Sequence, residues 1–340
     1  MPSTLKEKGP RLMVLPAYDD RLSRLLAGAM AMFLAMAALA GSPAMAGEST
    51  GQQYFPSPQL AVSALAAAAQ NGSDIEMLAI LGPESEDLIS SGDPVADRNG
   101  RLRFIAAYDE QHRLEQESED RAVLVIGGKD YPFPIPIVRQ GEAWVFDTPS
   151  GREEILTRRI GRNELHTLEV MHTYTAAQRE YACRKPNGGS PEFAQKFTSS
   201  EGQKDGLYWA IGENEEESPF GPLIARATRE GYRGGLDEVP PEPFHGYYFK
   251  ILKAQGEHAS GGAFDYVANG KMVLGFALLA YPSSYESSGI MTFIVNQEGV
   301  IYEKDLGEDT ATAAAAMSVF DPDESWSRHE EPATLKASGS

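Results

Sequence analysis

The chain has almost no cysteine, since Cys183 is the single one in 340 residues. An intramolecular disulfide is therefore excluded, and the hydrophobic core must hold the fold together. A lone thiol is open to two interpretations, a reactive group or a small apolar residue on a buried helix face. We favour the buried position, because unpaired cysteines usually behave as small hydrophobes.

The common signatures of catalysis and cofactor binding are also missing. The sequence has no serine nucleophile elbow, no HExxH, no GxxxxGK phosphate loop, no CxxC and no EF-hand loop. The stretch AVLVIGGKD contains two glycines but lacks the spacing of a dinucleotide-binding loop. We therefore expect no cofactor, while hydrolysis by a carboxylate site of another kind stays open.

Positive charge is scarce. The chain carries 30 lysines and arginines against 49 acidic residues, a formal net charge of −19. Such a surface repels nucleic acid and anionic lipid, and no basic cluster in the sequence offsets it. We expect no nucleic-acid partner. The acidic surface indicates either solubility or a cationic partner, metal ions included, and we favour solubility.

The sequence has one long apolar run, at residues 25–40. Two arginines precede the run, and a small-x-small triplet that ends at Ala46 follows it. This pattern predicts a signal peptide over residues 1–46, cleaved after Ala46, with Met1 or Met13 as the true start. The run is short for a bilayer span of about 20 residues, and an uncleaved anchor is the alternative. We expect a periplasmic or secreted protein without a stable membrane span.

The first part of the mature chain predicts an α+β domain over residues 58–151, after a linker over residues 47–57. Within this domain, the alternating prolines of residues 131–138 predict an edge strand or an extended segment. The predicted elements are helices at 60–69, 73–82 and 95–112 and strands at 121–127, 131–138 and 142–148. The inner stripe of the third helix is assigned to Leu102, Ile105, Ala106 and Asp109.

The second part, residues 152–326, predicts a long helix packed on an antiparallel sheet, also α+β. Residues 276–281 are apolar on both faces, so we expect a central strand covered on each side. The polar tail 327–340 is expected to be disordered. The long helix, or two abutting helices, is predicted at 152–184. Shorter helices are predicted at 191–199 and 221–232, and the other strands at 245–255, 290–295 and 300–304.

Many short blocks of this chain resemble, in order, those of a bacterial family catalogued as domain of unknown function 2950. The resemblance extends from about Phe55 to Trp326. The blocks include FPSP (55–58), SGDPVADR (91–98), YPFPIP (131–136), IGRNE (160–164), AQREYA (177–182), DGLYW (205–209) and HGYYFKIL (245–252). The family has no assigned reaction, so the resemblance implies no catalytic residue.

The second half is also similar to the globular head of type IV pilin-like proteins, in which a long helix packs on an antiparallel sheet. The blocks that carry this similarity are AQREYA, GYYFKI, FALLAYP, MTFIV and the hairpin sequence NQEG. A pilin begins with an apolar helical stalk, whereas this chain has a complete domain in that place. The similarity therefore implies a head-like contact or scaffolding module and no stalk-mediated fibre.

The most polar segment, SGDPVADR, supplies the candidates for acid–base chemistry. Asp93 or Asp97 would be the base and Arg98 would orient it, with further acids up to Asp109. The competing interpretation is helix capping, because Asp93 precedes Pro94 at a predicted helix start. We favour capping, since a helix start needs this chemistry in any case.

Histidines give two further candidates. His166, Glu169 and His172 recur every three residues and could be metal ligands, although successive steps of three drift around the helix and no partner segment is visible. We favour a structural role for them. His245, at the head of a predicted strand, is either a catalytic base or a histidine that joins loop and sheet by hydrogen bonds, and we favour the latter.

Three hypotheses for function follow. The first, which we favour, is a non-enzymatic interaction or scaffolding module that contacts another exported or cell-envelope protein. The second is a periplasmic hydrolase that uses carboxylates of the Asp93–Asp109 region. The third is a protein that binds a small ligand or a cation. A deep pocket shared by the SGDPVADR segment and His245 would count against the first hypothesis.

Overall fold

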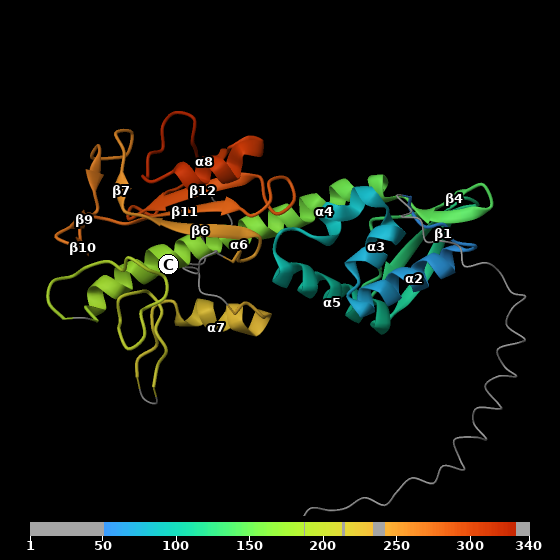
Figure 1. The fold of residues 1–340 in the computed structure, drawn as a ribbon, viewed down its shortest axis with the longest axis horizontal. Helices are drawn as coiled ribbons and strands as arrows, with labels where there is room; N and C mark the ends of the chain where they lie inside the picture. Colours follow the sequence, from blue (N-terminus) through green and yellow to red (C-terminus); the bar gives the residue numbers. More distant parts are fainter. Residues whose placement is uncertain (1–50, 187, 213–214, 234–241, 331–340) are drawn as a thin grey trace, which may run out of the picture. The chain divides into compact units, whose positions relative to one another are not determined.

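The computed structural model describes residues 51–186, 188–212, 215–233 and 242–330, and the predicted signal peptide lies outside them. The described residues form one compact α+β unit, in which a long helix lies beside antiparallel sheets (Figure 1). None of the helices in the described ranges has the length and apolar character that crossing a bilayer requires. The α+β class predicted from the sequence is confirmed.

The N-terminal half combines short helices with one antiparallel sheet of order β1-β2-β4-β5, and β3 also pairs with β2. Its helices are α2 (Pro58–Asn71), α3 (Asp74–Leu81), α4 (Glu86–Ile89) and α5 (Pro94–Glu110). Its strands are β1 (His112–Ser118), β2 (Arg121–Ile126), β3 (Tyr131–Pro132), β4 (Ile137–Gln140) and β5 (Ala143–Phe146). The Ala- and Leu-rich face of α2 packs on the sheet to form the first hydrophobic cluster.

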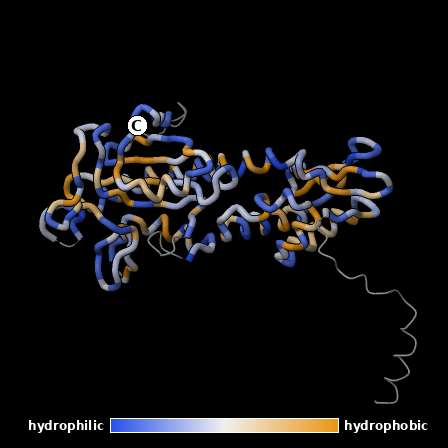
Figure 2. The backbone as a smooth tube through the Cα atoms, turned by 45° about the horizontal axis from the view of Figure 1, so that its top comes forward, coloured by the Kyte–Doolittle hydropathy of each residue, from blue (hydrophilic) through white to orange (hydrophobic). Residues whose placement is uncertain are grey.

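Helix α6 (Thr148–Arg184) continues into the second half, which holds a separate hydrophobic cluster. Near its start, Gly151 lies against the backbone of Pro134, where an added Cβ would collide with it. Because α6 begins at Thr148, the predicted boundary between residues 151 and 152 falls inside a continuous helix. Whether the halves act as separate domains stays a prediction. Figure 2 shows apolar backbone segments gathered in both clusters.

The second sheet has the order β14-β13-β12-β11-β6 and is antiparallel throughout. Its strands are β6 (Tyr247–Leu252), β11 (Ala277–Pro282), β12 (Met291–Asn296), β13 (Ile301–Asp305) and β14 (Ser327–Arg328). Strand β11 lies between β12 and β6, with α6 on one face and α8 (Thr310–Ala316) on the other (Figure 1). The prediction of a central, doubly covered strand is confirmed.

The remaining elements complete the second half. Helix α7 (Gly221–Glu230) ends at Gly231, in the left-handed conformation that glycine favours at a helix end. Short paired strands lie at β7 (Ala254–Gln255) with β8 (Phe264–Asp265) and at β9 (Val267–Ala268) with β10 (Lys271–Met272). The predicted turn at NQEG joins β12 to β13, and Gly299 has the expected positive φ of 79°.

Several local predictions are wrong. Residues 191–199 form no helix, because they make isolated bridges from Phe193 to Met272 and from Thr198 to Tyr208. Segment 131–138 divides at its prolines, and its end enters β4 between two strands. Ser327 and Arg328 belong to a strand, and only residues 331–340 of the predicted tail lie outside the described chain.

Three further corrections concern exposure. Leu102 is 51% exposed and Asp109 is exposed, because α5 turns Phe104, Ala107 and Tyr108 to the core instead. Cys183 is exposed, so it does not occupy the buried helix face that we expected. The predicted linker is tied to the first sheet from residue 51 onwards, since Phe55 is buried and exchanges two backbone hydrogen bonds with Trp144.

Candidate functional site

Asp93 is fully buried and joins the two halves of the chain. Its Oδ1 accepts the backbone N–H groups of Val95 and Ala96, at 3.1 and 2.9 Å, which caps α5 as predicted. Its Oδ2 accepts the Tyr232 hydroxyl at 2.9 Å and the Gly246 N–H at 2.8 Å. All four bonds satisfy a charge that would be very unfavourable if left alone in the interior. The carboxylate is therefore committed to structure.

Asp97 lies one turn further along α5 and is also bonded through both oxygens. It accepts the Ser91 N–H at 2.9 Å and the Ser91 hydroxyl at 2.6 Å. Burial raises the pKa of Asp97, while the Ser91 bonds and the charge of Arg159 act in the opposite direction. Arg98 is exposed on the same helix and does not orient either aspartate through any hydrogen bond or ion pair among the described residues.

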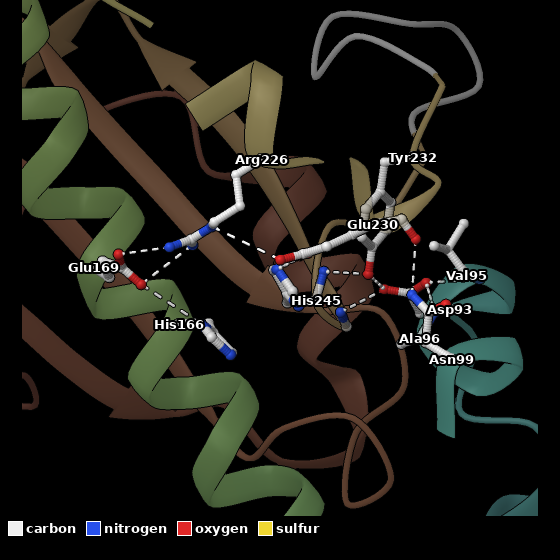
Figure 3. Close-up of polar contacts among 11 residues, drawn as sticks. Asp93, Val95, Ala96, Asn99, His166, Glu169, Arg226, Glu230, Tyr232 and His245 are labelled. Atoms are coloured by element: carbon white, nitrogen blue, oxygen red, sulfur yellow. Dashed lines mark hydrogen bonds and ion pairs between the residues drawn. The ribbon is translucent and has the colours of Figure 1, made fainter. Parts of the chain in front are cut away.

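His245 lies in a cluster of polar side chains from three helices (Figure 3). Its ring stacks on that of His166, with centroids 4.3 Å apart and planes at 18°. Its Nε2 lies 2.9 Å from Oε2 of Glu230, and Arg226 binds Glu169 through two nitrogens, at 2.8 and 3.2 Å. Glu169 also lies 3.6 Å from the imidazole of His166. Helices α6 and α7 are thereby joined through charged groups.

The environment of His245 keeps its imidazole neutral. Burial is the largest cause, and the positive charges of its surroundings add to it, which together lower the pKa of His245 to about 3. Its backbone has a φ of 50°, a left-handed conformation that is uncommon outside glycine but is adopted more often by asparagine, aspartate and histidine than by other residues. Among the described residues, neither His245 Nε2 nor Glu230 Oε2 makes a hydrogen bond of acceptable angle despite their short separation.

The proposed metal ligands are not brought to one point. Glu169 is paired with Arg226, and His172 is exposed on α6. Within the ranges that the structure describes, no group of three or more His, Cys, Asp or Glu side chains could hold a metal ion. The spacing of three residues thus produces a local contact, 3.6 Å from His166 Nδ1 to Glu169 Oε2, rather than a shared ligand position.

A cavity of about 1010 Å³ opens beside this cluster. One wall is apolar and comes from the first hydrophobic cluster, including Leu65, Met77, Phe104, Ile126, Phe133 and Ile155. The other wall is polar and comes from α5, α6 and the residues around α7, including Ser91, Asp97, Arg103, Arg162, Glu230 and His245. Residues of the SGDPVADR segment and His245 therefore share one cavity, although the buried Asp93 does not line it.

The charge of the cavity lining is opposite to that of the whole chain. Among the described residues that line it, six are cationic (Arg101, Arg103, Lys129, Arg158, Arg159 and Arg162) and three are acidic (Asp97, Glu110 and Glu230). The histidine at its polar end, His245, is neutral. Arg101 and Arg158 are paired with Asp74 and Glu154, so the lining keeps a small excess of positive charge in a protein whose net charge is −19.

The positive charge of Arg162 acts on both Arg103 and Arg159. Burial lowers the pKa of Arg103, and so does the neighbouring charge of Arg162. Burial likewise lowers the pKa of Arg159, with Arg162 as a smaller cause. Arg159 donates to the carbonyl oxygens of Asp87 and Leu88, whereas Arg103 and Arg162 have no carboxylate at ion-pair distance within the described chain.

Sequence reasoning missed these arginines, as well as Glu230 and Tyr232. A signal was present, because Arg158, Arg162 and His166 follow each other at intervals of four and so lie on one face of α6. Arg103 lies on α5, far away in sequence, and only the tertiary fold brings its charge close to that of Arg162. The pairing could not be read from either helix by itself.

The chain belongs to the family described as "Protein of unknown function (DUF2950)", whose profile matches residues 52–329. This agrees with the resemblance of the sequence blocks. Searches of curated proteins and of solved structures gave no match. The similarity to pilin heads stays a prediction, because it rests on the sequence blocks and on the arrangement of a long helix beside a sheet.

Proposed function

We propose that this protein binds a small, mainly apolar molecule in the cavity beside α5 and α6, and that it does so as a non-enzymatic, exported protein. The observation that carries the proposal is the cavity itself, whose lining combines many apolar side chains with a set of polar and charged ones. Natural ligand pockets have this composition and occupy about 300 to 1,000 Å³. Export follows from the predicted signal peptide, which lies outside the described residues.

The cavity favours a ligand over the contact module as the primary role. The SGDPVADR segment and His245 meet in it, an arrangement that would be unusual for a module working only through a flat sheet surface. A contact between the second sheet and another envelope protein is compatible with ligand binding. It is the second candidate, and it rests on the pilin-like sequence blocks and on the arrangement of a long helix beside a sheet.

The polar groups support binding rather than hydrolysis. Asp93 accepts four hydrogen bonds, so it has no free lone pair directed at a substrate. A histidine with a pKa of about 3 is a weak base at neutral pH, far from the value at which general-base catalysis is most efficient. His245 therefore suits a role in shaping the polar end of a binding site, and Asp93 suits a role in holding the surrounding segments in place.

Two variants of α5, in each of which one alanine is replaced by phenylalanine, test the proposal. Ala107 lines the cavity, whereas its neighbour Ala106 is exposed and does not. A neutral environment-sensitive dye such as Nile red is titrated into the wild-type protein, Ala107→Phe and Ala106→Phe. We expect one saturable site that Ala107→Phe removes and Ala106→Phe retains, because only the first phenylalanine enters the cavity. Equal binding by all three proteins would contradict the proposal.

A further inference from the structure

We propose that the ligand is a single-chain amphiphile with an anionic head, whose head binds Arg103 and Arg162 and whose tail lies along the apolar wall. This inference rests on the proposed function and specifies its ligand class. Its basis is charge complementarity, since the cavity concentrates positive charge in an otherwise acidic protein. An anion attracted to this point would experience a field of the opposite sign to that of the surrounding surface.

Arg103 and Arg162 line the cavity, and neither has a carboxylate at ion-pair distance among the described residues. Burial and the neighbouring charge of Arg162 lower the pKa of Arg103, and both side chains also reach solvent. Glu230 is the acidic residue near Arg103, but its carboxylate faces His245 and Arg226. Like charges held together beside an apolar cavity are typical of a site that receives the opposite charge.

The two guanidinium groups also explain why a head group would bind at this end of the cavity. Arg103 projects from α5 and Arg162 from α6, so an anion between them would join the two helices. Guanidinium groups donate in a planar fork that matches the oxygens of a carboxylate or a phosphate. His245 lines the same cavity, and its Nε2 lies 2.9 Å from the carboxylate of Glu230.

Displacement of the neutral dye distinguishes the head groups. The competitors share one alkyl chain and differ only in the head: dodecanol, dodecanoate, dodecyl phosphate and dodecyltrimethylammonium. We expect the apparent dissociation constants of both anions, measured by displacement of the dye, to be at least about tenfold lower than that of dodecanol. This difference corresponds to about 1.4 kcal/mol in binding free energy. The cation should bind more weakly than the alcohol. The stronger of the two anions then identifies a carboxylate or a phosphate head.

Charge-removing variants locate the head group. Arg103→Gln combined with Arg162→Gln should reduce the preference for the anions over dodecanol by about tenfold or more, while the affinity for the dye and for dodecanol stays the same. Arg98→Gln is the matched control, because Arg98 lies on α5, is exposed and does not line the cavity. Raising the salt concentration from about 0.01 M to about 0.15 M should weaken only the anions.

The possible outcomes separate the two proposals. If the dye binds and all four heads compete equally, the ligand is not selected by an anionic head and this inference fails, while the proposed function stands. If the double variant keeps the full preference for anions, the head does not bind at Arg103 and Arg162, and the inference fails as well. If neither the dye nor any competitor binds, the proposed function itself fails.

Discussion

The buried neutral His245 predicts that the protein loses stability in mild acid. Its pKa is about 3 in the folded chain, whereas an unfolded chain has a histidine pKa of about 6.5. The unfolded state therefore takes up the proton first as the pH falls below about 6.5, and the folded state becomes less stable until the pH reaches about 3. Above about pH 6.5 both states are neutral at this position, and the contribution disappears.

The size of the effect follows from the two pKa values. At about pH 4.5 the pH lies about two units below the histidine pKa of the unfolded chain, whereas His245 in the folded chain is still neutral. This difference lowers the free energy of unfolding by about 2 to 3 kcal/mol. Only 16% of the side chain is exposed, so solvent screening leaves most of this value in place. This is a large part of the total stability of an ordinary domain.

The variant His245→Asn isolates this contribution. Asparagine tolerates the positive φ of 50° at this position and does not titrate. Urea unfolding is measured for wild type and variant at about pH 7 and about pH 4.5. The free energy of unfolding of the wild type, taken relative to the variant, should fall by about 2 to 3 kcal/mol between the two pH values. Equal pH dependence of the two proteins would refute the reasoning.

His258 provides a control of opposite sign. It is exposed, and its bond to Asp321 raises the pKa of its imidazole. A raised pKa adds stability that is present at low pH and is lost as the pH rises through the folded value. His258→Asn should therefore remove a small stabilisation in acid rather than relieve a destabilisation.

Three other predictions concern stability and exposure. Asp93→Ala should lower the free energy of unfolding by about 3 kcal/mol or more, measured by urea denaturation, because it removes the α5 cap and leaves the Tyr232 hydroxyl and the Gly246 N–H unpaired. Gly246→Ala should destabilise by about 1 to 3 kcal/mol in the same assay, since φ is 78° and the new Cβ would lie 2.5 Å from Nδ2 of Asn163; a neutral result would contradict this geometry. Cys183 should react with a maleimide in the native protein at nearly the rate of the unfolded chain, and strong protection would show that the thiol is covered.

Features that depend on neighbouring residues were predictable from the sequence. The capping of α5 by Asp93 needs only the order Asp-Pro and a following helix, and the centre of the second sheet follows from an unbroken apolar stretch in β11. The turn at Gly299 follows from local backbone sterics. The α+β class could be predicted for the same reason, because the order of helices and strands is a property of local pattern.

Features that depend on distant residues were not predictable. The second oxygen of Asp93 binds Tyr232, 139 residues away, and nothing in either segment indicates its partner. Exposure of Cys183 depends on which face of α6 the sheet covers, and a single residue does not fix that. Strand β1 was missed because its mostly exposed, polar residues form an edge strand that only its pairing with β2 reveals.

The most direct test of a ligand cavity is photochemical labelling of the wild-type protein. A fatty acid with a photoreactive group in its tail is bound, activated and mapped by peptide mass spectrometry, with excess unlabelled dodecanoate as competitor. Competable labels in α5 and in the first half of α6, with none in β11 to β13, are the predicted result. Labels confined to the second sheet, or labels that the competitor does not reduce, would contradict the account.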